Sequence, residues 1–394
     1  MKKHFSYFNI ILICIIAVTA IACKEKEVQK KEVVLTPYNG PLPIENLNLP
    51  EGFKIDVYAD GIDGARSMAM GDEGTLFVGT RNDKTVYAIK DTNGDYRADM
   101  IKVLDSTLEV PNGIAFRDRA LYVAEVGRLL RYPNIEANLE TLPEPQVVYD
   151  DYPPEFHHGW KYIAFGPDGK LYVPVGAPCN ICDSTGVDPR YGTITRMNPD
   201  GTNREIYARG VRNTVGFTWH PETGDLWFTD NGRDLMGDDV PPCELNRVEE
   251  AGQHFGYPYC HGGTISDPEF GDQRPCSDFV PPVQALGAHV APLAVKFYRG
   301  DNFPQEFQQY AFIAEHGSWN RSSKVGYKIS LVKLDGNNAV SYKTFIDGWL
   351  NESTQEAFGR PVDMLFLEDG SMLISDDYGD AIYRVWYEAR LATK

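Results

Sequence analysis

From residue 50 onward, short runs of alternating apolar and polar residues are separated by Gly, Asp and Pro. Alternation with a period of two residues predicts half-buried β-strands, whereas the apolar spacing that marks an amphipathic helix is almost absent. Many short strands joined by turns are typical of an all-β sandwich, barrel or propeller. The pattern therefore predicts an all-β body.

The strand runs resemble one another along the chain. Five copies read as a strand, a tight Asp/Gly turn and a second strand, at 67–78, 113–123, 163–173, 215–229 and 362–375. A weaker sixth copy spans 293–315. Several copies are followed by a third strand with an Arg near its end, at 86–89, 129–132, 194–197 and 382–385. A repeat of roughly 45 to 50 residues predicts a β-propeller, and six copies predict a six-bladed one over residues 49–388.

One region does not fit the repeat. Residues 235–291 are too long for a loop within a blade and are rich in Pro, Gly and Cys. We expect a long insertion there, and inserted loops of this length are usually functional. Residues 389–394 follow the last repeated strand and are expected to form a C-terminal tail.

The N-terminus has the features of an export signal. Two lysines precede an apolar stretch at residues 5–22, and small residues lead into Cys23. This order is typical of a bacterial lipoprotein signal, so we expect residues 1–22 to be removed and Cys23 to carry lipid. The alternative is an uncleaved membrane anchor of about 18 apolar residues, near the lower limit for spanning a bilayer. In either case we expect an exported, membrane-anchored protein that faces the periplasm or cell surface, with residues 23–48 as a charged, flexible tether.

Composition limits the possible functions. The 394 residues include 38 Lys+Arg and 56 Asp+Glu, for a formal net charge of −18. A nucleic-acid surface needs a basic face that neutralises phosphates, so we expect no nucleic-acid partner. With 24% charged and 42% hydrophobic residues, a disordered chain, a coiled coil and a multi-span membrane protein are excluded.

Five of the seven cysteines lie in the body of the chain. Cys179 and Cys182 form a C-x-x-C motif, which serves metal binding, redox chemistry or a local disulfide. No second such pair completes a zinc site, and export to an oxidising compartment favours the disulfide. Cys260 and Cys276 could staple the insertion in the same way, which leaves Cys243 unpaired.

Propellers place ligands in the central channel, which is lined by the starts of the inner strands and the loops above them. Titratable or cationic groups recur at this place in four copies: His157 and His158, Arg212, His316 and Arg321, and Arg360. Each alone is explained by a solvated loop group or a salt bridge within its blade, but four that converge on one axis favour a ligand site. Arginines clamp planar anionic groups and lower the pKa of a nearby His, which suits a general base. The pattern predicts an anionic ligand and proton abstraction.

Two acidic loops have the chemistry of cation sites. Residues 91–99 place oxygen ligands at alternate positions, but they lack the spacing and the closing Glu of an EF-hand. Residues 230–239 combine Asp, Asn and Gly at the start of the insertion. Oxygen-rich, Gly-containing loops suit hard cations such as Ca²⁺, and ordinary polar turns explain both patterns as well.

Several segments together carry a resemblance to a known family. They are 158–173, the Arg212–Asn213 pair with 230–234, and 255–262, 287–292, 316–321, 359–363 and 375–378. As a set they resemble the glucose/sorbosone dehydrogenase family, whose members are six-bladed propellers related to soluble quinoprotein glucose dehydrogenase. The resemblance implies an oxidoreductase that oxidises a sugar or aldose hydroxyl with pyrroloquinoline quinone (PQQ) and Ca²⁺.

The resemblance also implies roles for individual residues. His158 would take the proton from the sugar hydroxyl as hydride passes to the quinone. Arg212 would bind the quinone oxygen and stabilise the charge that develops there, with Asn213 beside it as a further cofactor contact. His157 stands where the glucose enzyme has Asp, at a position of substrate contact.

Further residues would hold the cofactor and the metal. Arg360 and Arg321 match positions where the family binds the carboxylates of PQQ, with Lys324 as the alternative to Arg321. Ca²⁺ would lie on the backbone carbonyls of Gly232 and Arg233. The electron acceptor is not identified, because the chain has no C-x-x-C-H haem motif.

Two other functions are compatible with a propeller. A calcium-dependent hydrolase of the lactonase or strictosidine-synthase type would need carboxylate and Asn side chains around its metal, whereas the predicted channel residues are Arg and His. A propeller without catalytic activity that binds glycans or proteins is the other alternative.

Overall fold

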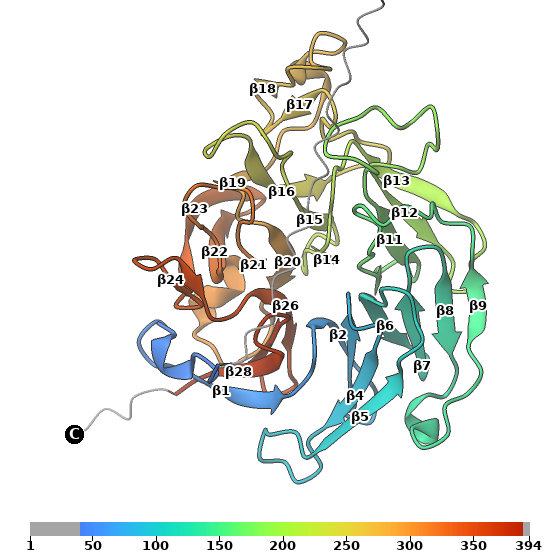
Figure 1. Cartoon of the computed structure of the whole chain (residues 1–394), viewed down its shortest axis with the longest axis vertical. Helices are drawn as coiled ribbons and strands as arrows, with labels where there is room; N and C mark the ends of the chain where they lie inside the picture. The colour runs from blue at the N-terminus through green and yellow to red at the C-terminus, as the bar shows by residue number, and fades with distance from the viewer. Residues whose placement is uncertain (1–39, 389–394) are drawn as a thin grey trace, which may run out of the picture. The chain divides into compact units, whose positions relative to one another are not determined.

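The computed structural model describes residues 40–388. The predicted signal peptide, Cys23, most of the predicted tether and the predicted tail at 389–394 lie outside the described residues. Within 40–388, six four-stranded antiparallel sheets follow one another around a ring (Figure 1). The predicted all-β fold, a six-bladed β-propeller, is confirmed.

We number the blades in chain order. Blade 1 consists of β2 (Ala65–Met70), β3 (Leu76–Thr80), β4 (Val86–Lys90) and β5 (Met100–Asp105). Blade 2 consists of β6 (Gly113–Arg117), β7 (Ala120–Ala124), β8 (Leu129–Tyr132) and β9 (Gln146–Tyr149). Blade 3 consists of β10 (Ala164–Phe165), β11 (Leu171–Val175), β12 (Thr193–Met197) and β13 (Glu205–Arg209). Blade 4 is β14 (Phe217–Trp219), β15 (Leu226–Asp230), β16 (Pro242–Val248) and β19 (Gln284–Ala288); blade 5 is β20 (Pro292–Phe297), β21 (Tyr310–Glu315), β22 (Lys328–Asp335) and β23 (Asn338–Ile346). Blade 6 is β26 (Pro361–Phe366), β27 (Met372–Asp376) and β28 (Ala381–Tyr387), completed by β1 (Phe53–Asp60).

Smaller elements lie between these strands. They are the hairpins β17 (Cys260–His261) with β18 (Ile265–Ser266) and β24 (Leu350–Asn351) with β25 (Glu356–Ala357), and the 3₁₀ helices η1 (Ile44–Asn46), η2 (Glu136–Asn138), η3 (Cys276–Asp278) and η4 (Gln305–Gln309).

The ring is closed by the first strand. β1 pairs with β28 in antiparallel register, from Phe53 opposite Tyr387 to Asp60 opposite Ala381. Figure 1 shows this pairing as the blue strand beside the red one. Around the axis, β2 contacts both β6 and β26, and β20 contacts both β14 and β26. Each blade therefore buries its faces against its neighbours, as a propeller requires.

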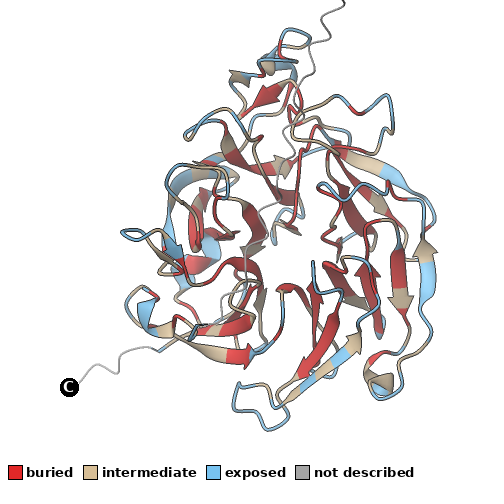
Figure 2. Ribbon diagram, in the orientation of Figure 1, coloured by how far each residue is buried: buried red, intermediate tan, exposed pale blue. Residues whose placement is uncertain are grey.

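Burial follows the position of a strand within its blade. All five residues of each second strand β3, β7, β11, β15 and β27 are buried, whereas the outer strands β5 and β23 are mostly exposed or half-buried (Figure 2). Strands buried on both faces are continuous apolar runs, and outer strands carry only one buried face. This explains why the repeated apolar pattern marks the inner half of each blade.

The consecutive antiparallel strands of each blade place two sets of loops at one end of the ring. Because neighbouring strands are antiparallel, the loop from an outer strand to the next inner strand and the loop between the second and third strands share one face. We call this the site face. It carries the loops that contain His158, Arg212 and Arg360, which lead into inner strands, and those that contain Arg233 and Arg321, which join second to third strands.

The limits of the insertion differ from those expected. Residues 235–291 contain β16 and β19, the third and fourth strands of blade 4, so the insertion proper is 249–283. It runs along β13 of blade 3, where the Arg209 amide bonds the Gln253 carbonyl at 2.9 Å and the Phe255 amide bonds the Arg209 carbonyl at 2.8 Å. The Pro and Gly residues around β16 and β19 hid these two strands in the sequence.

The predicted tether also ends earlier than expected. Leu47 is buried, and Leu42, Ile44 and Leu49 pack against the same apolar cluster at blades 5 and 6. The amide of Asn48 donates to the carbonyl of Asp347 at 2.9 Å. The apolar residues of 42–49 therefore belong to the propeller.

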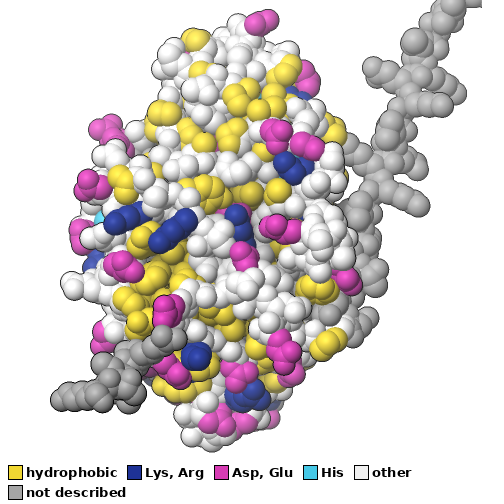
Figure 3. Space-filling model, turned by 90° about the vertical axis from the view of Figure 1, so that its left-hand side faces the viewer, with side chains coloured by type: hydrophobic (Ala, Val, Ile, Leu, Met, Phe, Trp, Pro, Cys, Tyr) yellow, Lys and Arg dark blue, Asp and Glu magenta, His cyan; other side chains and the backbone are white. Residues whose placement is uncertain are grey.

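Among the described residues, no helix has the length and apolar character to cross a membrane. On the side of the molecule seen in Figure 3, acidic and basic side chains are interspersed with apolar ones.

Candidate active site

Polar side chains gather where the inner strands begin. They are Arg66, Asn112, Lys161, Asn213 and Arg360, each at the start of an inner strand or at most four residues before it, and all are buried. Arg66 Nε donates to Asn112 Oδ1 at 2.6 Å, and Asn112 Nδ2 donates to the Lys161 carbonyl at 2.7 Å. Blades 1, 2 and 3 are thus joined by hydrogen bonds at the site face.

His158 is a buried base in the loop before β10. Its Nδ1 lies 2.9 Å from the carbonyl oxygen of Ala177. Because a carbonyl only accepts, Nδ1 carries the hydrogen and Nε2 keeps its lone pair. Burial lowers the pKa of His158 well below its usual value, and the positive charge of Arg212 lowers it further. The imidazole is therefore neutral at neutral pH and able to accept a proton.

The backbone holds His158 in an uncommon conformation. Its φ is +55°, in the left-handed region where residues other than Gly are rare and which is concentrated at functional sites. Gly176 lies directly against it, since a Cβ on Gly176 would be 2.6 Å from His158 Cβ and 2.7 Å from its carbonyl oxygen. The exposed ring of His157 is next to that of His158, with 4.0 Å between the ring centroids.

Ala177 joins His158 to Arg212. Its carbonyl accepts the His158 hydrogen bond, and its amide donates to the Arg212 carbonyl at 2.8 Å. The chain around Arg212 is fixed from the other side by Asp230, whose two carboxylate oxygens accept the amides of Arg212 and Asn213 at 2.7 Å each. Burial raises the pKa of Asp230 to about 6. The predicted base and the predicted quinone-binding arginine are therefore connected by hydrogen bonds through Ala177.

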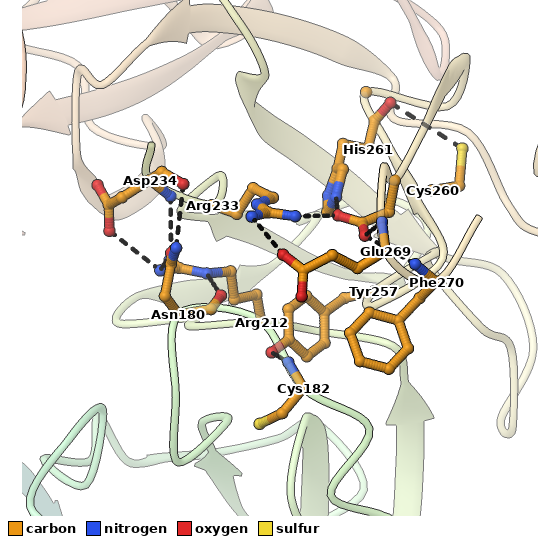
Figure 4. Close-up of polar contacts among 12 residues, drawn as sticks. Asn180, Cys182, Arg212, Arg233, Asp234, Tyr257, Cys260, His261, Glu269 and Phe270 are labelled. Carbon is orange, nitrogen blue, oxygen red and sulfur yellow. Dashed lines mark hydrogen bonds and ion pairs between the residues drawn. The ribbon is translucent and has the colours of Figure 1, made fainter. Parts of the chain in front are cut away.

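The guanidinium of Arg212 is held by the loops around it (Figure 4). Nε donates to the Asn180 carbonyl at 2.9 Å, and Nη2 donates to Asn180 Oδ1 at 2.9 Å and Asp234 Oδ2 at 3.2 Å. Nη1 donates to the Asn231 carbonyl at 3.1 Å. One hydrogen of Nη1 has no acceptor among residues 40–388, which leaves one directed donor for a ligand.

A second cluster surrounds Asp377 between blades 1, 5 and 6. Its Oδ1 accepts from His316 Nε2 at 2.6 Å, and its Oδ2 pairs with Arg66 Nη1. Arg360 donates from Nε to the His316 carbonyl at 3.0 Å and from Nη2 to the Gly317 carbonyl at 2.7 Å. Burial, and then the charge of Arg360, lower the pKa of His316 to about 4. His316 is therefore a second neutral imidazole at this end of the ring.

Two cations of the site lack a carboxylate partner. Arg360 bonds backbone carbonyls, and Lys161 Nζ donates to the carbonyls of Val126 at 2.6 Å and Gly159 at 2.8 Å. Within the described part of the chain, neither forms an ion pair. Burial, and then the charge of Arg190, lower the pKa of Lys161 to about 7. Arg360 thus keeps a positive charge without a carboxylate partner in a protein of net charge −18, and Lys161, whose pKa is about 7, can take up a proton beside an anionic ligand.

The predicted calcium ligands lie in the loop after β15. The carbonyl oxygens of Gly232 and Arg233 accept no hydrogen bond from residues 40–388, so they are available to a hard cation. No group of three or more His, Cys, Asp or Glu side chains with metal-binding geometry occurs in that part of the chain. The two carbonyl oxygens would make up part of the about six to eight oxygen ligands that Ca²⁺ takes.

The insertion supports this loop. Arg233 pairs with buried Asp267 through Nη1 and with exposed Glu269 through Nη2 at 3.2 Å, and His261 Nε2 lies 2.8 Å from Asp267 Oδ2 (Figure 4). A cavity of about 10 Å³, the size of one water molecule, is lined by Arg212, Asp230, Gly232, Glu244 and Tyr257 among others.

The other acidic loop is a polar turn at the opposite end of the ring. Residues 91–99 join β4 to β5, and this third-to-fourth-strand loop lies away from the site face. Asp91 Oδ1 accepts the amides of Asn93 at 3.2 Å and Gly94 at 2.7 Å, and Asp91 Oδ2 accepts the amide of Tyr96 at 2.8 Å. These bonds are those of ordinary turn chemistry.

The remaining predicted residues, Arg321 and Lys324, lie in the loop between β21 and β22, on the site face. Arg321 bonds the Asp238 carbonyl at 3.1 Å and Asp239 Oδ1 at 2.9 Å, and Lys324 Nζ bonds the Gln355 carbonyl at 2.7 Å. No hydrogen bond or ion pair of the described residues joins either side chain to His158, Arg212 or Arg360.

The cysteines of the body form two disulfides. Cys179 pairs with Cys182 in the loop between β11 and β12, and Cys260 pairs with Cys276 in the insertion. Cys243 is free and buried in β16.

Sequence reasoning missed part of the site. It did not select Arg66, Arg81, Lys161 or Asp377, and it noted His316 without giving it a role. Arg66 is the second residue of β2, whereas the predicted residues lie in loops outside the inner strands. Arg81 lies over the Trp160 ring at 3.7 Å and contributes to the lowered pKa of His158; it follows the second strand of blade 1.

A family model described as TrAA12-like matches residues 47–388. An uncharacterized protein from Borreliella burgdorferi is 34% identical over 408 residues, which cover 98% of this chain and all of that protein.

Three solved structures share the fold. The PQQ domain of a pyranose dehydrogenase from Coprinopsis cinerea, in its holo form, has a TM-score of 0.74 at 19% identity, covering 86% of this chain and 97% of that one. A calcium structure of a Trichoderma reesei enzyme of carbohydrate-active family AA12 has a TM-score of 0.75 at 20% identity, covering 89% of this chain and 98% of that one. The PQQ-bound aldose sugar dehydrogenase of Streptomyces coelicolor has a TM-score of 0.62 at 21% identity, covering 86% of this chain and 100% of that one. The three structures show the propeller fold, and together with the family model they confirm the resemblance that the sequence motifs carry.

Proposed function

Since this chain belongs to the TrAA12-like family, we propose that it is an oxidoreductase that uses PQQ and Ca²⁺ to oxidise a hydroxyl group of a sugar or aldose. The observation that carries the proposal is the neutral imidazole of His158, fixed beside Arg212 at the end of the ring where cations gather. The fold that the chain shares with PQQ-containing sugar dehydrogenases supports it.

His158 would act as the base. Its Nδ1–H is committed to Ala177, so the lone pair of Nε2 is the acceptor for the proton of the sugar hydroxyl. The lowered pKa keeps that lone pair free at neutral pH. Exposed His157 is next to it, which agrees with a role in contacting the substrate.

Arginines would hold the cofactor. When bound, PQQ would supply the two-electron acceptor for the hydride that leaves the sugar carbon, and its three carboxylates need cationic partners. Arg360, Arg66 and Lys161 are buried cations near the inner strand starts, and Arg212 has one Nη1 hydrogen left for an oxygen atom, with Asn213 beside it. Arg321 and Lys324 bond neighbouring loops, and a direct contact of either with a carboxylate of PQQ stays a prediction.

Ca²⁺ would be held by the free carbonyls of Gly232 and Arg233. A cation there would lie in the loop whose Asn231 and Asp234 already bond Arg212. Its positive charge would complement a carboxylate-bearing cofactor.

The test is reconstitution. Purified protein freed of ligands is mixed with PQQ and CaCl₂, and dye reduction is followed with a panel of sugars. We expect turnover that needs PQQ, Ca²⁺ and a sugar, and a loss of about 10²- to 10⁴-fold in His158→Ala. The matched control is His220→Ala, since His220 lies in the β14–β15 turn at the opposite end of the ring. Absence of PQQ binding, or full turnover by His158→Ala, would refute the proposal.

We also propose that the protein is exported and anchored through lipid on Cys23. The support is the order of basic, apolar and small residues before Cys23. Growth with labelled palmitate should label the wild-type protein and not Cys23→Ser, and the variant should leave the membrane fraction. A labelled Cys23→Ser protein would contradict this anchor.

A further inference from the structure

The C-x-x-C motif of the third blade has a structural relation to the site that its sequence does not reveal. Cys179 and Cys182 are joined in a disulfide, and Asn180 lies between them. The side chain of Asn180 is directed at Arg212, and the two loops that carry them meet at the site face (Figure 4).

Asn180 binds one whole edge of the Arg212 guanidinium. Its carbonyl oxygen accepts from Nε and its Oδ1 accepts from Nη2, both at 2.9 Å. This two-point contact fixes the plane of the guanidinium as well as its position, as a carboxylate does in a bidentate pair. A neutral amide makes this contact without adding a second negative charge to the one that Asp234 already places beside Nη2.

Asn180 is itself held on two sides. Its Nδ2 donates to the Asp234 carbonyl at 3.0 Å, and its Oδ1 accepts the Asp234 amide at 2.8 Å. Only this orientation of the amide group satisfies all three side-chain bonds, so its oxygen and nitrogen are assigned by their partners. On the other side, the disulfide closes the loop, and the Cys182 amide donates to the Tyr257 hydroxyl at 3.0 Å.

We propose that Asn180, held in the ring closed by the Cys179–Cys182 disulfide, is the positioning residue of Arg212. It aims the remaining Nη1 hydrogen of Arg212 at the ligand, and the disulfide keeps Asn180 in place. The inference rests on the proposed function for its effect on turnover, but the clamp itself is a property of the protein without ligand.

The experiment compares Asn180→Ala, Asn180→Asp and the double variant Cys179→Ser/Cys182→Ser with wild type, and takes Ile181→Ala, from the same four-residue ring, as the control. We expect Asn180→Ala to lower kcat by about 10- to 100-fold, because a small misplacement of a positioned group has effects of this size. The affinity for PQQ, measured by titration in the presence of CaCl₂, should change by less than about 3-fold, since an interaction used in the reaction lowers kcat rather than binding. Asn180→Asp keeps the acceptor for Nη2, so its kcat should lie closer to that of wild type than the kcat of Asn180→Ala does. The double variant should also lower kcat.

A second measurement reads the clamp without turnover. The Nη2–H signals of Arg212 in a ¹⁵N spectrum, assigned with Arg212→Lys, should exchange slowly in wild type and Ile181→Ala and faster in Asn180→Ala and the double variant, because Nη2 donates to Asn180 Oδ1. Wild-type kcat together with slow exchange in Asn180→Ala would overturn the proposal, as would equal losses of PQQ affinity and kcat. If wild type shows no turnover with PQQ, the proposed function fails, and the exchange rates alone decide the clamp.

Discussion

At the scale of single residues, the site depends on how a buried imidazole is kept neutral. Burial and Arg212 disfavour the imidazolium form of His158, so its pKa lies well below the ordinary value near 6.5. For a base this shift extends the active, unprotonated form toward lower pH. We therefore expect kcat/KM to stay constant as the pH falls from 8 through 6.5 and to decline only in more acidic solution.

The measurement is a pH–rate profile of kcat/KM, with PQQ and Ca²⁺ saturating at each pH. An acid limb centred near pH 6.5 would mean that the base titrates as an exposed histidine does. In that case His157, which is exposed, would be the better assignment for the base.

Close contact at Gly176 gives a second residue-scale prediction. An added Cβ would lie 2.6 Å from His158 Cβ, so Gly176→Ala has to displace the imidazole. We expect kcat to fall by about 10²-fold while the protein stays folded. Gly186→Ala in the same loop is the matched control, because nothing lies within 4 Å of its added Cβ. Equal activity of the two variants, measured by dye reduction, would show that the position of His158 is not critical.

The sequence could predict those residues whose chemistry and place in the repeat were both visible. His158, Arg212 and Arg360 lie in the loops that lead into strands that repeat clearly, and the structure brings them to one end of the ring. Asp377 and Asn180 could not be found in this way, because their roles come from contacts with residues 311 and 32 positions away in the chain. Such partners become visible only once the blades are closed into a ring.

At the scale of elements, the insertion at 249–283 acts as a support for the loop after β15. Arg233 of that loop has one buried partner, Asp267, and one exposed partner, Glu269, with side-chain exposures of 0% and 58%. Breaking a buried ion pair costs about 3–5 kcal/mol, whereas an exposed pair contributes about 0–1 kcal/mol. Asp267→Asn should therefore weaken Ca²⁺ binding and lower the unfolding midpoint of the apoprotein, and Glu269→Gln should do neither.

Calcium titration by calorimetry and thermal unfolding of the two variants check this prediction. If Glu269→Gln weakened Ca²⁺ binding as much as Asp267→Asn, burial would not explain the support. If neither variant changed Ca²⁺ binding, the loop after β15 would not depend on the insertion.

The apolar pattern of the sequence predicted the inner strands of the blades better than the outer strands and the strands next to the insertion. The inner halves of the blades were predictable because their strands are buried on both faces and read as apolar runs. Outer strands such as β5 and β23 are largely exposed, so their sequences carry little pattern. β16 and β19 were assigned to the insertion, since Pro and Gly surround them and the hairpin β17–β18 separates them.

At the scale of the whole propeller, we expect the ring of residues 40–388 to unfold as one cooperative unit, because each blade packs against its neighbours. The length of 394 residues alone would suggest two or three domains, and only the repeats indicated a single ring. What the repeats did not reveal is the closure, because β1 lies before the first copy and completes the last blade. The packing of Phe53 is the clearest consequence of that closure.

Phe53 of β1 links blade 6 to blade 5. Its ring lies 4.9 Å from that of Phe303, 5.0 Å from Phe345 and 5.1 Å from Tyr387, between ring centroids. Replacing a buried Phe with Ala costs about 3–5 kcal/mol. Because the seam closes the ring, we expect Phe53→Ala to lower the free energy of unfolding of the whole propeller, as one transition that far-UV circular dichroism and tryptophan fluorescence report at the same denaturant concentration. Val340→Ala on exposed β23 should leave the midpoint unchanged, since Val340 is 56% exposed. Two separate transitions in Phe53→Ala would show instead that the blades unfold independently once the closing strand is loosened.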